Sequence, residues 1–281
     1  MKYFDLHCDT VSKCIKNSVL PGDMSLAASL EKGKIFSEWR QCFAVFISDD
    51  SSNPKNDYLS QTNYYKIKFR NDDAVKPILT LENALAIDSS DFVDVLVYDG
   101  ISAVTLTWNN ENSIAGGACT EVGLKPFGRE IIAKLNDKHI AVDLSHLNKK
   151  SFFEVADCSN TVFASHSCCY KTHRHIRNLT DDQIKLIAER GGLIGICFYP
   201  EFLGTKYVFE GVWRHIFHLL NLGYEKNIAF GSDFDGAVMS PELDGVDKIP
   251  FLYDYLHNKG VGRTVLDNIF FNNAELFFKN L

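Results

Sequence analysis

The sequence lacks a surplus of positive charge and lacks any long apolar segment. Lys and Arg together number 29 against 36 Asp and Glu, which gives a net charge of −7 and a pI near 5.7. An acidic chain of this kind does not by default present the basic surface that nucleic-acid binding requires. The longest apolar runs, 43–47 and 193–199, are strand-sized, whereas a membrane span needs roughly 18 to 20 residues. We therefore expect neither a nucleic acid nor a membrane as a partner.

Cys-x-x-Cys motifs, low-complexity segments and proline-rich linkers are also missing. The eight Cys are scattered, and no Cys-x-x-Cys spacing occurs, so we expect reduced thiols rather than a disulfide scaffold. Asp5 and His7 interrupt the stretch where a secretory signal would be apolar. Together these features predict a cytoplasmic location. No boundary in composition divides the chain, which is expected to form one domain over residues 1–281.

What recurs is a short apolar run of strand type followed by a helical stretch. Eight such runs occur, each apolar enough to be buried on both faces, as parallel strands are. This alternation predicts an α/β fold, a (β/α)8 TIM barrel, with a doubly wound open sheet as the alternative. The runs are Tyr3–Thr10, Gln41–Ile47, Lys76–Glu82, Ser102–Trp108, Ile140–His146, Thr161–Ser167, Gly192–Tyr199 and Asn227–Asp233, and the helical candidates include Phe127–Lys138, Lys149–Ala156, Asp181–Arg190 behind the N-cap Thr180, Gly211–Leu222 and Arg263–Asn280.

The expected strands end in ionisable side chains, at the end of a barrel where active sites lie. His7 and Asp9 are two positions apart, and because side chains alternate along a strand they share one face. A buried charge must be exposed or paired, since an isolated one is costly. Such side chains should therefore converge near the barrel axis. The other strand-end groups are Glu82, Asp143, His146, His166 and Asp233.

Five of these side chains form a candidate metal site of imidazoles and carboxylates without a thiolate. This donor set suits Zn²⁺, Mn²⁺ or Fe²⁺ in a hydrolytic site better than a structural zinc, which favours Cys. Five ligands suffice for two ions, and Glu82 is the natural bridge because each of its oxygens can take one ion. We expect hydrolysis by a hydroxide shared between the two ions. The candidate ligands are His7, Asp9, Glu82, His146 and His166.

The loop 171–178 brings further cationic candidates to the same end. A guanidinium at Arg177 could grip a substrate carboxylate bidentately, and an exposed, solvated Arg is the alternative. His173 and His175 are open as ligands or substrate contacts. Only Arg177 and Lys171 are expected to bring positive charge near the strand ends. The other histidines, at 139, 215, 218 and 257, are expected to be surface or packing residues.

The pieces occur in a fixed order along nearly the whole chain. They are His7-Cys8-Asp9, Glu82, Asp143-Leu144-Ser145-His146, Phe163-Ala164-Ser165-His166-Ser167, Arg177-Asn178 followed by Asp181-Asp182, Cys197-Phe198-Tyr199 and Gly231-Ser232-Asp233-Phe234-Asp235-Gly236. This ordered set resembles the renal, or membrane, dipeptidase family of binuclear zinc peptidases. The resemblance implies a barrel of the metallo-dependent hydrolase type.

The resemblance also implies a role for each of these residues. His7, Asp9 and Glu82 would hold one zinc, and Glu82, His146 and His166 the other. Arg177 would bind the C-terminal carboxylate of a dipeptide, and Asp233 its free amine or the transferred proton. Asp233 is preferred to Asp235 because it is expected to end the eighth strand. The implied reaction is hydrolysis of a dipeptide, including one with a C-terminal D-residue, and a homodimer is left open.

One position departs from the family pattern. Vertebrate members carry a His after the fourth strand, thought to bind the oxyanion, where this chain has Leu106-Thr107-Trp108. Trp108 offers only an indole N–H, and we expect it to contact the substrate, with Asn109, Asn110 or Asn112 as alternative donors. A secretion signal and lipid-anchor tail are not evident, so a soluble member of microbial type is expected. Two other functions stay open: hydrolysis of another amide or a phosphoester, and a metal-binding barrel without catalysis.

Overall fold

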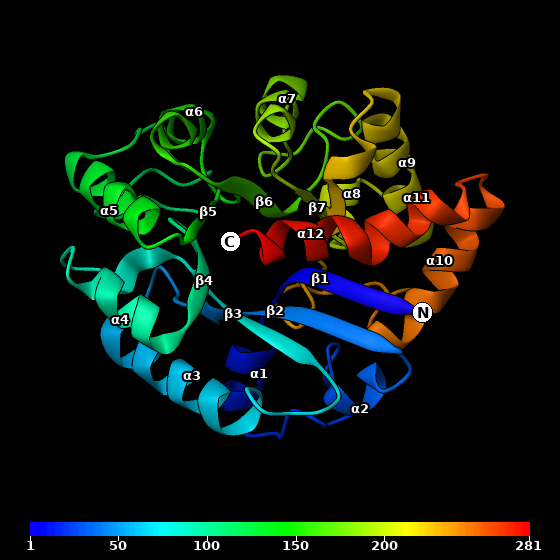
Figure 1. The fold of residues 1–281 in the computed structure, drawn as a ribbon, viewed down its shortest axis with the longest axis horizontal. Helices are drawn as coiled ribbons and strands as arrows, with labels where there is room; N and C mark the ends of the chain where they lie inside the picture. Colours follow the sequence, from blue (N-terminus) through cyan, green and yellow to red (C-terminus); the bar gives the residue numbers. More distant parts are fainter.

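Eight parallel strands close into a barrel in chain order, with β1 paired to both β2 and β8 (Figure 1). The computed structural model describes residues 1–281. The pairing of β1 with β8 confirms the predicted (β/α)8 barrel and excludes a doubly wound open sheet, whose edge strands would stay apart. The strands are β1 (Lys2–Cys8), β2 (Glu38–Phe46), β3 (Lys76–Glu82), β4 (Ile101–Thr105), β5 (Ala141–Asp143), β6 (Val162–Ser167), β7 (Ile194–Ile196) and β8 (Ile228–Phe230).

Helices surround the barrel, and none of them has the length and apolar character needed to cross a membrane. The single helix expected at 263–280 is interrupted by a π-helical turn, which buries the consecutive residues Ile269, Phe270 and Phe271. The helical elements are α1 (Thr10–Asn17), α2 (Leu30–Gly33), α3 (Pro54–Lys68), η1 (Ala84–Ala86), α4 (Phe92–Asp99), α5 (Pro126–Asp137), α6 (Lys149–Cys158), α7 (Asp181–Glu189), α8 (Pro200–Leu203), α9 (Val208–Asn221), η2 (Glu225–Asn227), η3 (Val246–Lys248), α10 (Ile249–Asn258), α11 (Arg263–Asp267), η4 (Asn268–Asn272) and α12 (Asn273–Lys279).

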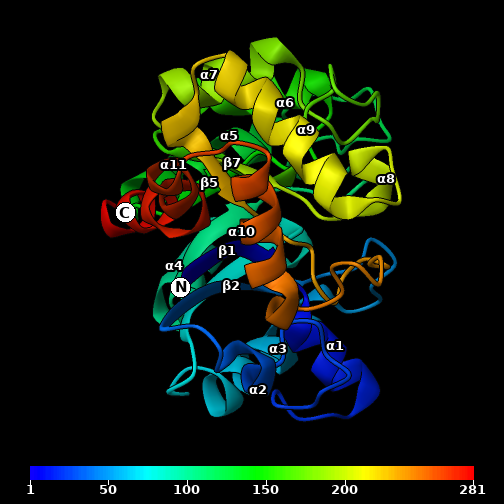
Figure 2. The same ribbon diagram turned by 90° about the vertical axis from the view of Figure 1, so that its right-hand side faces the viewer.

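The N-terminal end of the barrel is closed by η4 and α12. Phe4 and Phe163 point into this end and pack against aromatic side chains of the C-terminal segment, with ring centroids 5.3 Å apart for Phe4 and Phe278 and 5.4 Å apart for Phe163 and Phe277. Figure 1 shows α12 lying across the barrel, and Figure 2 shows the loops after β8 on the opposite side. The polar C-terminal strand ends therefore lie at the opposite end of the barrel from this apolar plug, which consists of η4 and α12.

Side-chain caps fix two helices beside the polar end. Thr180 accepts a hydrogen bond from the Gln183 N–H and is the predicted N-cap of α7, and the Gln183 side chain completes a capping box. Asn148 Oδ1 accepts from the Ser151 N–H at 2.8 Å and caps α6. Each cap contributes about 1 kcal/mol by satisfying an otherwise unpaired donor. The loops that carry His146 and Arg177 therefore end at these two capped helix starts.

Candidate metal centre and substrate cavity

The structure brings the five candidate metal ligands together at the C-terminal end of the barrel. Glu82 ends β3, and His7 and His166 each lie one residue before the end of β1 and β6; Asp9 and His146 follow β1 and β5. His7 Nε2 lies 3.3 Å from Asp9 Oδ2 and 3.3 Å from Glu82 Oε2. The Nε2 atoms of His146 and His166 are 2.8 Å apart. All five side chains are buried, with exposed fractions of 6% or less.

Glu82 lies between the histidines, and its two oxygens face different imidazoles. Oε2 is nearest His7, whereas Oε1 is 3.0 Å from His146 Nε2 and 3.8 Å from His166 Nε2. Burial alone would raise the pKa of Glu82, but His7 and His146 bring it well below its usual range. An ionised carboxylate with one oxygen on each side is the arrangement that a bridge between two cations requires.

The protonation of the histidines follows from their neighbours. Burial lowers the pKa of His146 to about 4, helped by Arg177. Burial, with the nearby His7, lowers the pKa of His166 well below its usual range. Burial would do the same for His7, but Glu82 and Asp9 raise its pKa well above the usual value. Two of the three imidazoles are therefore neutral, the form that binds a metal.

A serine relay fixes the tautomer of His166. Ser165 Oγ donates to Asp143 Oδ2 at 2.5 Å and lies 2.7 Å from His166 Nδ1. Because the hydroxyl proton is committed to Asp143, the Ser165 oxygen accepts from Nδ1–H of His166. Nε2 then carries the lone pair, with Arg177 Nη2 at 2.9 Å and Glu82 Oε1 at 3.8 Å. Outer partners of this kind orient metal-binding histidines in proteins generally.

One carboxylate oxygen of the site has no partner. Asp9 Oδ1 is buried and accepts no hydrogen bond, although an unpaired buried anion is costly. The pKa of Asp9 is raised to about 6 by burial and by Glu82. An orphaned carboxylate oxygen beside several imidazole nitrogens fits a divalent cation better than it fits a purely structural cluster.

Asp233 and Asp235 have different surroundings. The expectation that Asp233 ends the eighth strand is wrong, because β8 ends at Phe230. Asp233 instead lies in the following turn, with Oδ1 4.0 Å from His7 Nε2 and its pKa raised to about 8 by burial, with Asp9 and Glu82 adding to the effect. Asp235 accepts hydrogen bonds from Thr10 Oγ1 at 2.7 Å and from the Ala27 N–H at 2.9 Å. Asp233 therefore faces the site, whereas Asp235 fastens neighbouring loops.

Two site residues hold unusual backbone conformations. His146 has φ 68° and Asp233 has φ 63°, the left-handed region that L-residues seldom occupy. A buried carboxylate supports the second turn, because Asp5 accepts from the Ser232 N–H at 2.8 Å and from Ser232 Oγ at 2.6 Å. The surrounding hydrogen bonds thus impose on the turn the conformation that directs Asp233 toward His7.

Arg177 is buried rather than solvated, with 7% of its surface exposed. Its Nε donates to His146 Nδ1 at 3.1 Å, and its Nη2 lies 2.9 Å from His166 Nε2. The guanidinium also lies over the Phe202 ring at 5.3 Å from the centroid. His175 accepts the Arg177 N–H at 3.2 Å, so it supports the loop that carries the guanidinium. A buried cation at this depth is placed to bind an anionic group beside the metal ligands.

Trp108 and Asn109 form another wall of the site. The Trp108 ring packs edge-on against Phe46 at 5.5 Å and tilts toward His146 at 6.2 Å between ring centroids. Asn109 Oδ1 lies 3.1 Å from His146 Nδ1. Asn112 is committed elsewhere, since its amide nitrogen donates to Leu106 O at 2.7 Å. Among the three asparagines, only Asn109 lines the cavity.

The cavity over these groups has a volume of about 760 Å³, a size suited to a small ligand. The expectation that only Arg177 and Lys171 bring positive charge to this end is wrong. Lys13 and Lys16 on α1 line the cavity, because α1 starts directly after Asp9 and presents positions three apart on one face. That spacing is visible in the sequence once the helix is placed.

His173, one of the two loop histidines considered as a ligand or substrate contact, packs near Gly204 instead.

The remaining histidines are surface or packing residues, as predicted. His139 and His257 are exposed, and His218 pairs with Asp181 at 2.8 Å. His215 is fully buried on α9, where its Nδ1 accepts the Cys169 N–H at 3.0 Å. Burial lowers the pKa of His215 to about 3, so it is a neutral structural residue.

Known proteins share both this sequence pattern and this fold. An uncharacterised protein from the pqqA 5′ region of Klebsiella pneumoniae is 31% identical over 197 residues, which are 65% of this chain and 73% of that protein. An uncharacterised dipeptidase of Schizosaccharomyces pombe is 34% identical over 183 residues, 61% of this chain. The matched part spans 45% of that dipeptidase, so the chain covers about half the length of this relative.

Solved structures agree in fold across the whole chain. A dipeptidase AC, described as a metallopeptidase of family M19, superposes with a TM-score of 0.89 at 23% identity, covering 99% of this chain and 98% of the other. A metallopeptidase from Rhodobacter sphaeroides, bound to a phosphinate mimic of the dipeptide L-Ala-D-Ala, gives a TM-score of 0.89 at 23% identity, with 99% of both chains covered.

The sequence profile of one family accounts for most of the chain. The membrane dipeptidase profile, peptidase family M19, matches residues 51–279. This range includes Glu82, His146, His166, Arg177 and Asp233. The order of the motifs, the closed barrel and the profile agree, and the chain therefore belongs to the membrane dipeptidase family, peptidase family M19.

Proposed function

We propose that this protein is a zinc dipeptidase that hydrolyses the single peptide bond of dipeptides. The observation that carries the proposal is the convergence of four buried imidazole and carboxylate side chains around Glu82, next to the buried Arg177 and to Asp233. A structural metal site would not need a buried guanidinium and a further carboxylate opening on the same cavity. Membership of a dipeptidase family supports this assignment.

Two groups of residues would hold the metal ions. His7, Asp9 and Glu82 form one set, and Glu82, His146 and His166 form the other, with Glu82 common to both. The unpartnered Asp9 Oδ1 and the neutral imidazoles of His146 and His166 support this division. Bound divalent ions would supply a water of lowered pKa and would polarise the substrate carbonyl. The imidazole and carboxylate donors, without a thiolate, fit zinc in a hydrolytic role better than a structural zinc.

Recognition of both charged ends would restrict the substrate to a dipeptide. Arg177 would bind the C-terminal carboxylate, because a guanidinium can hold a carboxylate through two parallel hydrogen bonds. Asp233 would bind the free amine. A peptide with one more residue would lose one of these two contacts. The L-Ala-D-Ala mimic bound to the Rhodobacter sphaeroides metallopeptidase supports including substrates with a C-terminal D-residue.

Asp233 and the wall at Trp108 would assist the reaction. Asp233, whose Oδ1 lies 4.0 Å from His7 Nε2, is also placed to take a proton on its carboxylate and pass it to the leaving amine. Trp108, through its indole N–H, is proposed to contact the substrate where vertebrate members place a His. A single donor to a developing oxyanion contributes about 3–4 kcal/mol.

The proposal is tested with purified protein and a panel of L,L- and L,D-dipeptides, assayed before chelation, after chelation and after zinc is returned. The expected result is about two metal ions per chain by elemental analysis and cleavage that chelation removes and zinc restores. Glu82→Gln should lose both metal and activity. Two bound metals without cleavage of any dipeptide would refute the dipeptidase assignment and direct attention to another amide or a phosphoester. Activity that survives complete metal removal would refute the metal-dependent mechanism.

A further inference from the structure

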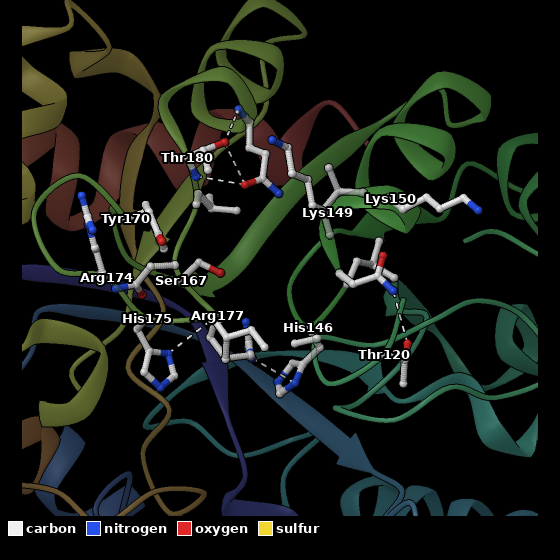
Figure 3. A pocket seen from close by; sticks show the side chains of 18 of the residues that line it. Thr120, His146, Lys149, Lys150, Ser167, Tyr170, Arg174, His175, Arg177 and Thr180 are labelled. Atoms are coloured by element: carbon white, nitrogen blue, oxygen red, sulfur yellow. Dashed lines mark hydrogen bonds between the residues drawn. The ribbon is translucent and has the colours of Figure 1, made fainter. Parts of the chain in front are cut away.

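A second cavity adjoins the substrate cavity on the far side of Arg177. Its volume is about 600 Å³, and it lies between the segments that follow β5 and β6 (Figure 3). His146, His175, Ile176 and Arg177 line both cavities. The two spaces are therefore neighbours across the guanidinium that we propose binds the substrate carboxylate.

The lining of this second pocket is cationic. Lys149, Lys150, Arg174 and Arg177 contribute four positive side chains, against one carboxylate, Glu121. None of these four forms an ion pair in the structure, whereas other basic residues do, such as Lys138 with Asp94 at 2.5 Å. Unpaired cations gathered around a concave site create a positive potential that attracts anions.

Hydrogen-bond donors without partners lie in the same pocket. Ser167 is fully buried, and its Oγ has no hydrogen-bond partner; Figure 3 shows this hydroxyl directed into the pocket near Arg177. An unsatisfied buried hydroxyl is unfavourable and indicates a missing acceptor. The first turn of α6 adds the N–H groups of Lys149 and Lys150, which have no partner within the helix. A helix N-terminus carries partial positive charge and binds anions well.

We propose that this pocket binds an anionic group, namely the side-chain carboxylate of the substrate's C-terminal residue. The inference rests on the proposed function, because Arg177 holding the main-chain carboxylate would leave that residue's side chain beside the pocket. Lys149 and the Ser167 hydroxyl would then bind the second carboxylate. The enzyme would prefer a C-terminal Asp or Glu over the neutral Asn or Gln of similar shape.

The test compares kcat/KM of the zinc-loaded enzyme for Ala-Asp against Ala-Asn and for Ala-Glu against Ala-Gln, each with an L- or a D-residue at the second position. We expect a preference of about tenfold for the acidic member of a pair, as charge-assisted hydrogen bonds give. Lys149→Gln and Ser167→Ala should each reduce severalfold the ratio of kcat/KM for the acidic substrate to kcat/KM for the neutral one. A general loss of activity would lower both values and leave this ratio unchanged. Lys226→Gln, on η2 and exposed, is the matched control and should leave the ratio unchanged.

The failures can be told apart. Cleavage of Ala-Ala without any acidic preference would overturn the second pocket as a substrate site and leave the dipeptidase assignment intact. No cleavage of any dipeptide would overturn both proposals. A free anion has the same chemistry, so inorganic phosphate is the second probe. Thermal stabilisation of the zinc-loaded enzyme by phosphate, abolished in Lys149→Gln and without an acidic preference, would assign the pocket to a free anion and refute the substrate role.

Discussion

Replacing Ser165 with Ala should weaken metal binding although Ser165 is not a metal ligand. The substitution removes the oxygen that accepts Nδ1–H of His166 and that donates to Asp143 at 2.5 Å. His166 is then left with a buried, unsatisfied N–H, or it shifts the proton to Nε2 and loses the lone pair that faces Glu82. Removing an outer partner of a metal-binding His typically lowers affinity about 10- to 100-fold, which is about 1.4–2.8 kcal/mol.

The assay is a zinc titration against a competing chelator at neutral pH, with the fold checked by circular dichroism. Thr105→Val is the matched control, because Thr105 Oγ1 also donates to Asp143 Oδ2, at 2.7 Å, but forms no hydrogen bond with His166. This control should lose about 1 kcal/mol of stability with little change in zinc affinity. Wild-type affinity in Ser165→Ala, or an equal loss of affinity in both variants, would refute the relay.

Three further predictions concern stability, substrate binding and pH. Phe271→Ala, in the plug of the barrel, should cost about 3–5 kcal/mol of unfolding free energy in urea titrations and leave zinc affinity unchanged, and a shift in zinc affinity would contradict the separation of the two ends. Arg177→Lys should raise KM for dipeptides about 10-fold or more and change kcat less, because an ammonium cannot bind a carboxylate through two parallel hydrogen bonds; steady-state kinetics with unchanged KM would reject the role of Arg177. The pKa of His215 is lowered to about 3 by burial, so the unfolded chain takes up an extra proton below its ordinary value of about 6.5. Stability from the neutral ring is therefore complete above that pH and is lost as the pH falls toward 3, by about 1.4 kcal/mol per pH unit. His215→Asn keeps an acceptor for the Cys169 N–H without titrating, and urea unfolding at pH 6.5 and 4.5 should show a loss about 2–3 kcal/mol smaller than in wild type; parallel losses would refute the assignment.

The barrel could be predicted because each strand is an apolar run ended by polar residues, but the strand limits could not. The seventh strand was expected over Gly192–Tyr199, whereas β7 covers Ile194–Ile196. Cys197 and Phe198 beyond its end remain fully buried. Hydrophobicity in the sequence indicates burial but not strand pairing. Residues beyond the last backbone hydrogen bond of a strand are as buried as those in the strand, so the sequence does not show where the strand ends.

The convergence of the five candidate ligands could be predicted because they lie at or just beyond the C-terminal ends of strands, and the parallel strand ends of a barrel meet. Their supporting contacts could not be predicted in the same way. The approach of Asn109 to His146 and the cationic lining from Lys149 and Arg174 depend on the paths of loops. Neither hydrophobic periodicity nor motif spacing determines where a loop directs its side chains. The structure places Asp233, and not Asp235, at the site, but the feature that separates them is the hydrogen bonding of Asp235 and not the end of a strand.

The left-handed backbone conformation at His146 and Asp233 lowers the stability of the fold at two positions that we propose take part in activity. Each such conformation costs an L-residue about 1–2 kcal/mol, and glycine adopts it without that cost. A search for more heat-resistant variants that does not assay activity would therefore favour glycine at the two positions where we propose that an imidazole and a carboxylate act. Efforts to engineer a sturdier version of this barrel should keep positions 146 and 233 fixed and seek stability elsewhere, for example around α12.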